Sequence, residues 1–142
     1  MSSIVRSILL AAVVAFLVAS GAQAEAGKPH RVVIQVDQND AEVMNLALNN
    51  AKNEDAVVEI VAYGPGLHML RDDTSPVKDR IKQLAELSFP SALTFSACNN
   101  TKQGMEKREG HPITIIPQAT IVPAGVVRIM ELEEQGYSYV KP

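Results

Sequence analysis

The stretch RVVIQVDQND, residues 31–40, decides the fold class of this 142-residue chain. Its first six residues are mostly apolar and β-branched, which is typical of a short strand covered on both faces. A polar loop follows, in which Asn39 and Glu42, three residues later, resemble a helix-capping box. The helix that begins there is expected to bury one face, formed by Val43, Leu46, Ala47 and Asn50. The pattern predicts a strand, a loop and a helix in that order.

The alternation of strands and helices continues to the end of the sequence. Further strands are predicted at residues 56–63, 91–97, 119–122 and 137–140. A short helical turn is predicted at 67–70 and a brief helix at 101–107. Between them a helix is predicted to begin at Ser75 and Pro76, and its buried stripe is expected to be Val77, Ile81, Leu84 and Ala85. The last helix is expected to open at Pro123, to stop at Gly136 and to turn Val126, Val127, Met130 and Leu132 mostly inward. Such alternation predicts a single three-layer α/β domain, a mostly parallel sheet with helices on both faces.

The first 24 residues have the pattern of a secretory signal peptide. Arg6 precedes an uncharged apolar run at 8–18, and Ala22-Gln23-Ala24 has the small-x-small pattern of a signal-peptidase site. The run is shorter than the roughly 20 apolar residues that a spanning helix needs. We therefore expect cleavage before Glu25, a mature domain of residues 25–142 in the periplasm, and no membrane contact after cleavage. The alternative is an uncleaved N-terminal anchor.

Charge and cysteine content exclude several classes of function. The chain has 13 Lys and Arg against 16 Asp and Glu, a formal net charge of −3, and no basic stripe that would bind nucleic acid. Cys98 is its one cysteine, so no disulfide can form within the chain even in an oxidising compartment. We expect no cofactor.

The expected binding site lies beyond the carboxyl ends of the strands, as in other open parallel sheets. The stretches 37–40, 63–66 and 98–101 should meet there. Cys98 lies between a strand end and a helix start, where free N–H groups and the helix dipole stabilise thiolate over thiol. Lys102 would strengthen this effect if its side chain turned back toward the sulfur. The alternative is a buried structural cysteine that packs behind Phe95.

Several segments resemble the DsrE/DsrF-like family of small sulfur-metabolism proteins, a group that includes YchN-like proteins. They are VMNLALNNAKN (43–53), VAYGPGLHML (61–70), SPVKDRIKQLAE (75–86), FSACNNT (95–101) and IVPAGVVRIMELEEQGYSYVKP (121–142). They are spread along most of the expected mature chain, from residue 43 to residue 142.

The resemblance implies a compact α/β domain that assembles into homo-oligomers, often trimers or hexamers. It also implies a cysteine that accepts sulfane sulfur as a persulfide and passes it to a partner. Cys98 matches the cysteine of the family's F-x-A-C-x-N-T stretch. The ligand-binding residues that the resemblance implies around it are Asn99, Asn100, Thr101, Tyr63, Gly64 and Gly66.

Two classes of function follow from these features. The first is an extracytoplasmic sulfur carrier in which Cys98 is catalytic and both the sulfur donor and the acceptor thiol are other molecules. The second is a non-catalytic oligomeric binding module for a small anion or a partner protein, in which Cys98 is structural. A weaker third possibility adds His68 or His111 to Cys98 as metal ligands. Since no ligand-spacing motif is present, we expect no metal.

Overall fold

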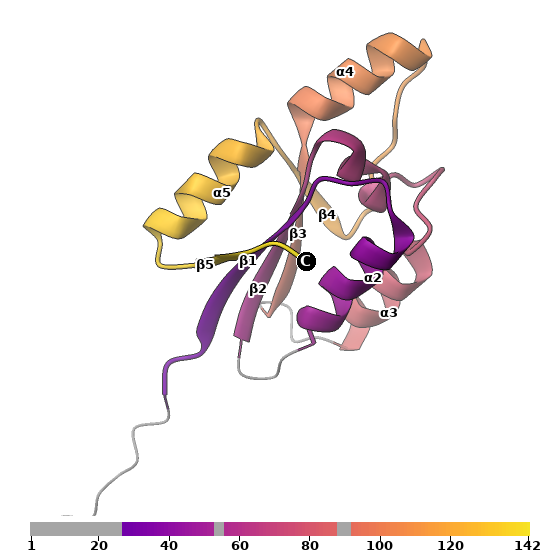
Figure 1. Cartoon of the computed structure of the whole chain (residues 1–142). Helices are drawn as coiled ribbons and strands as arrows, with labels where there is room; N and C mark the ends of the chain where they lie inside the picture. The colour runs from indigo at the N-terminus through magenta and orange to yellow at the C-terminus, as the bar shows by residue number, and fades with distance from the viewer. Residues whose placement is uncertain (1–26, 53–55, 88–91) are drawn as a thin grey trace, which may run out of the picture.

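The computed structural model describes residues 27–52, 56–87 and 92–142; the expected signal peptide, residues 1–24, lies outside them. In these ranges five strands form one all-parallel sheet in the order β4-β3-β2-β1-β5. The strands are β1 (His30–Val36), β2 (Ala56–Ala62), β3 (Leu93–Cys98), β4 (Ala119–Val122) and β5 (Ser138–Val140). The helices are α2 (Ala41–Asn50), the 3₁₀ helix η1 (Gly64–Leu70), α3 (Lys78–Leu87), α4 (Asn99–Glu109) and α5 (Gly125–Glu134) (Figure 1). The predicted single α/β domain is confirmed.

The helices lie on both faces of the sheet. Helices α2 and α3 cover one face, α5 covers the other, and α4 extends beyond the carboxyl ends of the strands (Figure 1). This arrangement follows from the strand order, because β4 and β5 lie at opposite edges and a right-handed connection between them must cross the face opposite to α2 and α3. None of the helices in the described ranges has the length and apolar character needed to cross a membrane.

The two faces of the sheet differ in chemistry. Under α2 and α3 lies the main apolar core, which includes Ile34, Ile60, Phe95, Leu48 and Ile81. The face under α5 has a small apolar cluster, formed by Val33, Val61, Ile129 and Leu132. The same face holds three buried polar side chains, Gln35, Glu59 and Ser96. Buried polar groups need partners, so α5 must supply some of them.

The buried face of α2 differs from the prediction. Met44, Ala47 and Leu48 are buried, whereas Leu46 is 45% exposed. The N-cap is Asp40 and not Asn39, since Asp40 Oδ1 accepts hydrogen bonds from the N–H groups of Glu42 and Val43. The buried stripe thus begins one residue later than expected, which corresponds to a rotation of about 100° around the helix axis.

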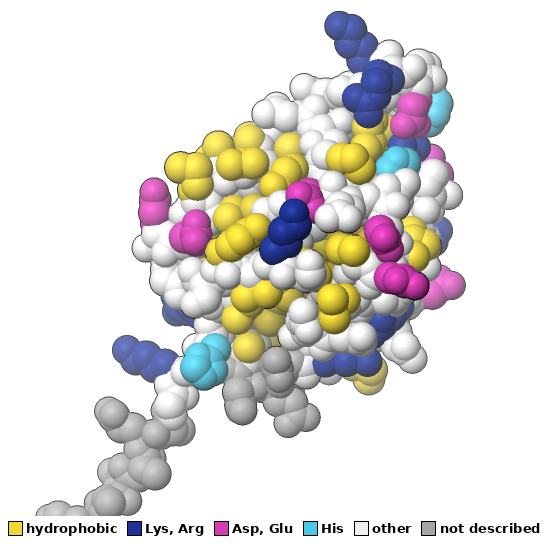
Figure 2. Space-filling view, viewed as in Figure 1, with side chains coloured by type: hydrophobic (Ala, Val, Ile, Leu, Met, Phe, Trp, Pro, Cys, Tyr) yellow, Lys and Arg dark blue, Asp and Glu magenta, His cyan; other side chains and the backbone are white. Residues whose placement is uncertain are grey.

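The prediction for α5 was also wrong for three of its four inward residues. Val126, Val127 and Met130 are exposed by 54%, 51% and 54%, and only Leu132 is buried as expected. The helix turns Gly125, Arg128, Ile129 and Leu132 toward the sheet. The inward stripe includes an arginine because its partner, Glu59, is buried in the sheet. Figure 2 shows apolar side chains on the outer surface over α5.

The tight turn after β2 brings η1 against the end of β1. A Cβ at Gly66 would lie 2.1 Å from the carbonyl oxygen of Val36, so a side chain cannot fit there. Helix α3 begins at Lys78, two residues after the expected Pro76, although Val77 already accepts the first helical hydrogen bond, from the Ile81 N–H. Of the stripe predicted for this helix, Val77, Ile81 and Leu84 are buried.

Candidate functional site

Two helix N-termini meet at the sulfur of Cys98. Cys98 is the last residue of β3 and the N-cap of α4, and its Sγ accepts a hydrogen bond of 3.5 Å from the Thr101 N–H. The backbone N–H of Gly125, the first residue of α5, also acts on this sulfur and lowers its pKa. The two helix starts are also joined directly, because the Asn100 N–H donates to the Pro123 carbonyl at 3.3 Å. The positive ends of both helix dipoles therefore face the thiol.

The hydrogen bonds at this sulfur favour its ionised form. Burial acts to raise the pKa of the Cys98 thiol, but donors oppose it: the Thr101 side chain and the backbone N–H groups of Thr101, Gly125 and Asn100. Their combined effect lowers the pKa below the ordinary value of a cysteine. The expectation of a thiolate-stabilising position at the strand end agrees with this geometry.

The thiol lies on the α5 face of the sheet and not behind Phe95. Neighbouring residues of a strand point to opposite faces, so Ser96 and Cys98 face α5 while Phe95 packs in the main core. Cys98 is 5% exposed, yet it belongs to neither apolar cluster of the described residues. The expected contribution of Lys102 is not observed, because its ammonium pairs with Glu106 one helical turn further on.

Most of the expected site residues lie around this sulfur. The Gly64 N–H donates to Thr101 Oγ1 at 2.9 Å, which joins the start of η1 to the start of α4. Gly64 adopts a left-handed conformation with φ of 53°, which favours glycine. Asn99 begins α4. Gly66, in contrast, packs against the end of β1.

Tyr63 forms one wall of the site and packs against α5. A Cβ at position 125 would lie 2.9 Å from Tyr63 Cβ, so the absence of a side chain at Gly125 allows the start of α5 to approach the end of β2. Burial raises the pKa of the Tyr63 hydroxyl, and the negative charge of Asp37 adds to this effect. The hydroxyl therefore stays protonated at neutral pH and can donate a hydrogen bond.

An ion pair that sequence reasoning did not find holds α5 on the sheet. Arg128 donates from Nε and Nη2 to the two carboxylate oxygens of Glu59, at 2.7 and 2.8 Å, and the Ser96 hydroxyl donates to Glu59 Oε1 at 2.6 Å. Glu59 is 5% exposed. A carboxylate in the middle of the apolar strand AVVEIVA was the feature that could have revealed it.

A second polar cluster lies at the ends of β1 and β5. Asp37 Oδ2 accepts hydrogen bonds from Gln35 Nε2 at 2.8 Å and from Lys141 Nζ at 3.0 Å, and Tyr139 donates to Gln35 Oε1. The hydrogen bond to Asp37 raises the pKa of Lys141. Asp37 Oδ1 is buried and has no hydrogen-bond partner within the described residues. The loop at 37–40 thus reaches the same edge of the sheet as Tyr63.

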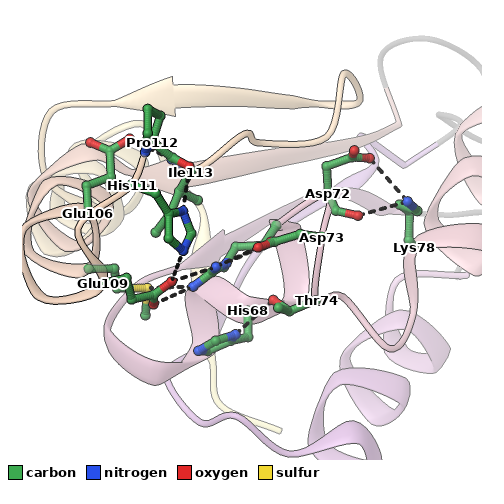
Figure 3. Close-up of polar contacts among 12 residues, drawn as sticks. His68, Asp72, Asp73, Thr74, Lys78, Glu106, Glu109, His111, Pro112 and Ile113 are labelled. Atoms are coloured by element: carbon green, nitrogen blue, oxygen red, sulfur yellow. Dashed lines mark hydrogen bonds and ion pairs between the residues drawn. The ribbon is translucent and has the colours of Figure 1, made fainter.

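The two candidate histidines belong to another network (Figure 3). His68 Nδ1 lies 2.9 Å from Thr74 Oγ1, and His111 Nε2 lies 3.3 Å from Glu109 Oε2. Beside them the buried guanidinium of Arg71 is held by Asp73 and Glu109. In the part of the chain that the structure describes, no group of three or more His, Cys, Asp and Glu side chains could hold a metal ion.

The comparisons with known proteins support the fold. No family profile matches the chain, and no curated protein sequence matches it. The chain is similar to the solved structure of MTH1491 from Methanobacterium thermoautotrophicum, a protein of unknown function. The two share 27% sequence identity with a TM-score of 0.66, over 80% of this chain and 99% of that one. The chain is therefore similar in fold to an uncharacterised α/β protein.

Proposed function

We propose that this protein is an extracytoplasmic sulfur carrier of the DsrE/DsrF-like family, which holds sulfane sulfur as a persulfide on Cys98. The observation that supports this function best is the meeting of two helix N-termini at one thiol whose pKa is lowered. A thiolate is the form of cysteine that attacks sulfur, and the same N–H groups would stabilise the persulfide anion that forms.

The reaction has two steps that the geometry suits. The Cys98 thiolate attacks the outer sulfur of a donor, a new S–S bond forms, and the donor's leaving group departs with the electron pair of its old bond. An acceptor thiolate then attacks the outer sulfur of the persulfide, and Cys98 leaves as a thiolate. Since the chain has no second cysteine, the acceptor must be another molecule.

The small exposure of Cys98 restricts the first step more than the second. With only 5% of the residue exposed, the donor must be small enough to reach a nearly buried thiol. A bound persulfide places its outer sulfur about 2 Å further out, at the S–S bond length, where a protein thiol can approach it more easily. Small donors and protein acceptors are therefore the expected partners.

The second candidate is a non-catalytic binding module, and the burial of Cys98 is the observation that favours it. Alkylation and mass spectrometry distinguish the two functions. For a carrier, iodoacetamide should label Cys98 of the folded protein well below pH 8.5, and polysulfide or thiosulfate should add one sulfur atom that a thiol reductant removes. The Cys98→Ser variant should gain nothing. A thiol that is labelled only in denaturant would exclude the carrier and leave the binding module.

The compartment and the assembly are parts of the same proposal. We place the mature protein, beginning at Glu25, in the periplasm, and N-terminal sequencing of the exported protein tests this placement; an intact Met1 would contradict it. We also propose a homo-oligomer, a trimer or a hexamer. The exposed Val126, Val127 and Met130 on α5 support self-association, because surface helices rarely leave three neighbouring apolar side chains uncovered.

A further inference from the structure

A groove of about 460 Å³ lies between η1 and α4, next to the Cys98 site. Its polar lining comes from Asn39, His68, Asn100, Thr101 and Arg108, and Gly104 forms part of its wall. Among these residues Arg108 has the only full charge, although the whole chain has a net charge of −3. Lys and Arg side chains also gather over α4 at the top of Figure 2. The groove is thus suited to a negatively charged ligand.

The guanidinium of Arg108 is available to such a ligand. Arg71 and Arg128 are each held by carboxylates through paired hydrogen bonds. Arg108, in contrast, makes no hydrogen bond or ion pair with any residue in the described ranges. Its Nη1 lies 3.8 Å from the place where a Cβ of Gly104 would be, so the side chain folds back along α4 over the groove wall. A planar guanidinium in this position can bind two oxygens of one anion.

Gly104 is a second and independent indication of a ligand. It lies in the middle of α4, where glycine is among the least favourable residues for helix stability. A Cβ there would meet only Arg108 Nη1, at an ordinary contact distance, so packing within the chain does not require glycine. The glycine instead keeps open the wall of the groove beneath the guanidinium.

The neutral side chains of the groove can complete the binding of an oxyanion. Asn39 and Asn100 have amide groups with two N–H donors each. His68 Nδ1 is engaged by Thr74, which leaves Nε2 as its remaining hydrogen-bonding atom (Figure 3). Thr101 belongs both to the groove and to the hydrogen bonds around the Cys98 sulfur. Thr101 therefore connects the groove to the Cys98 sulfur, although Cys98 itself does not line the groove.

We infer that this groove binds the anionic end of a sulfur oxyanion of the thiosulfate class, with Arg108 as its principal recognition group. This inference rests on the proposed function, because it names the donor for Cys98. The Cys98 thiolate would attack the sulfane sulfur of thiosulfate, form the persulfide anion and release sulfite, which keeps the electron pair of the broken S–S bond. No oxidant or reductant is needed, since one S–S bond replaces another.

Calorimetric titration of the Cys98→Ser protein with thiosulfate, and separately with sulfate, tests the groove without any sulfur transfer. Both dianions should bind, because recognition depends on the oxygens and the charge. Arg108→Gln should weaken binding at least tenfold, whereas the neighbouring Lys107→Gln, which removes the same charge outside the groove, should weaken it no more than twofold. Equal losses in the two variants, or no binding of either anion, would overturn the inference.

A groove-filling variant gives a test that loss of stability cannot explain. Gly104→Leu should weaken binding of thiosulfate at least tenfold while the urea midpoint of unfolding stays the same or rises, because leucine favours helix more than glycine. Unchanged binding would contradict the inference. A second measurement uses the protein that retains Cys98. If Arg108→Gln formed the persulfide from thiosulfate at the wild-type rate, the result would refute anion recognition in the groove but not the sulfur-carrier function. Binding that depends on Arg108, without any transfer of sulfur, would refute the carrier but not the groove.

Discussion

Replacing Glu59 by glutamine should raise the pKa of the Cys98 thiol although it removes a negative charge. Glu59 binds Arg128 through two hydrogen bonds, and this pair holds α5 where the Gly125 N–H lowers the pKa of the thiol. Loss of a nearby negative charge would by itself lower the pKa of a thiol. A higher pKa can arise only if α5 shifts and the Gly125 N–H leaves the sulfur. The sign of the change therefore separates positioning from simple electrostatics.

The size of both effects can be worked from the structure. Removal of one partner from a buried ion pair costs about 3–5 kcal/mol. The Arg128 side chain is 28% exposed and can turn to water, and glutamine still accepts from Ser96, so we expect a loss of about 2 kcal/mol in the free energy of unfolding. A hydrogen bond to a charged group contributes about 1.5–3 kcal/mol. Its loss at the thiolate would raise the pKa by about one to two units.

The assay is the rate of iodoacetamide alkylation as a function of pH, together with urea unfolding of the same protein. Asp73→Asn is the matched control, because it removes a carboxylate partner of the buried Arg71, in the network of Figure 3. This control should lose stability and leave the alkylation profile unchanged. If Glu59→Gln lost stability while its alkylation midpoint stayed at the wild-type pH or moved lower, α5 would not be positioning the thiol.

Gly66→Ala should destabilise the protein by about 3 kcal/mol in urea unfolding, because its Cβ would lie 2.1 Å from the Val36 carbonyl oxygen; a loss below about 1 kcal/mol would mean that η1 can move away. Met130→Glu should convert the proposed homo-oligomer to monomers in light scattering without changing the circular dichroism spectrum, and an unchanged oligomer mass would show that α5 is not the interface. The hydrogen bonds to Arg71 lower the pKa of Asp73 and of Glu109 in the folded protein. These two carboxylates therefore contribute fully to the free energy of unfolding above the carboxyl pKa of the unfolded chain, about 4. The contribution is lost as the pH falls through the lower pKa values of the folded protein. Between pH 7 and pH 3, Asp73→Asn should therefore lose less stability than wild type, and equal losses would contradict this role.

The elements of the fold could be predicted from the sequence because the strands are strongly apolar and the loops between them are short. The face that α5 buries against the sheet could not be predicted from the sequence. An amphipathic helix is expected to bury its apolar residues, and this expectation places Val126, Val127 and Met130 inside, whereas they are exposed. In the protein Arg128 points inward, because burial of Glu59 makes a charged partner on the facing helix necessary.

The candidate site, like the fold, could be predicted only in part from the sequence. The strand-end position of Cys98 and the nearby Gly64 and Thr101 could be predicted, since parallel strands bring their carboxyl ends to one edge. The contribution of Gly125 could not be predicted from its own neighbours in the sequence. It depends on the order of the strands, which sends α5 back across the sheet so that its first residue reaches a cysteine at the end of β3.

The contacts that hold α5 and β5 on the sheet can form only after almost the whole chain has been synthesised. The thiol is synthesised before α5, one of the two helices whose N–H groups lower its pKa, and the ion pair that holds α5 joins residues 69 positions apart. The edge strand that follows is tied to β1 across 104 positions, by the bond from Tyr139 to Gln35. Contacts between residues so far apart in the sequence are slow to form, because loop closure costs entropy before the contacts contribute. A nascent or partly folded chain therefore lacks the contribution of Gly125, and the pKa of the Cys98 thiol is lowered in full only when the last helix has docked.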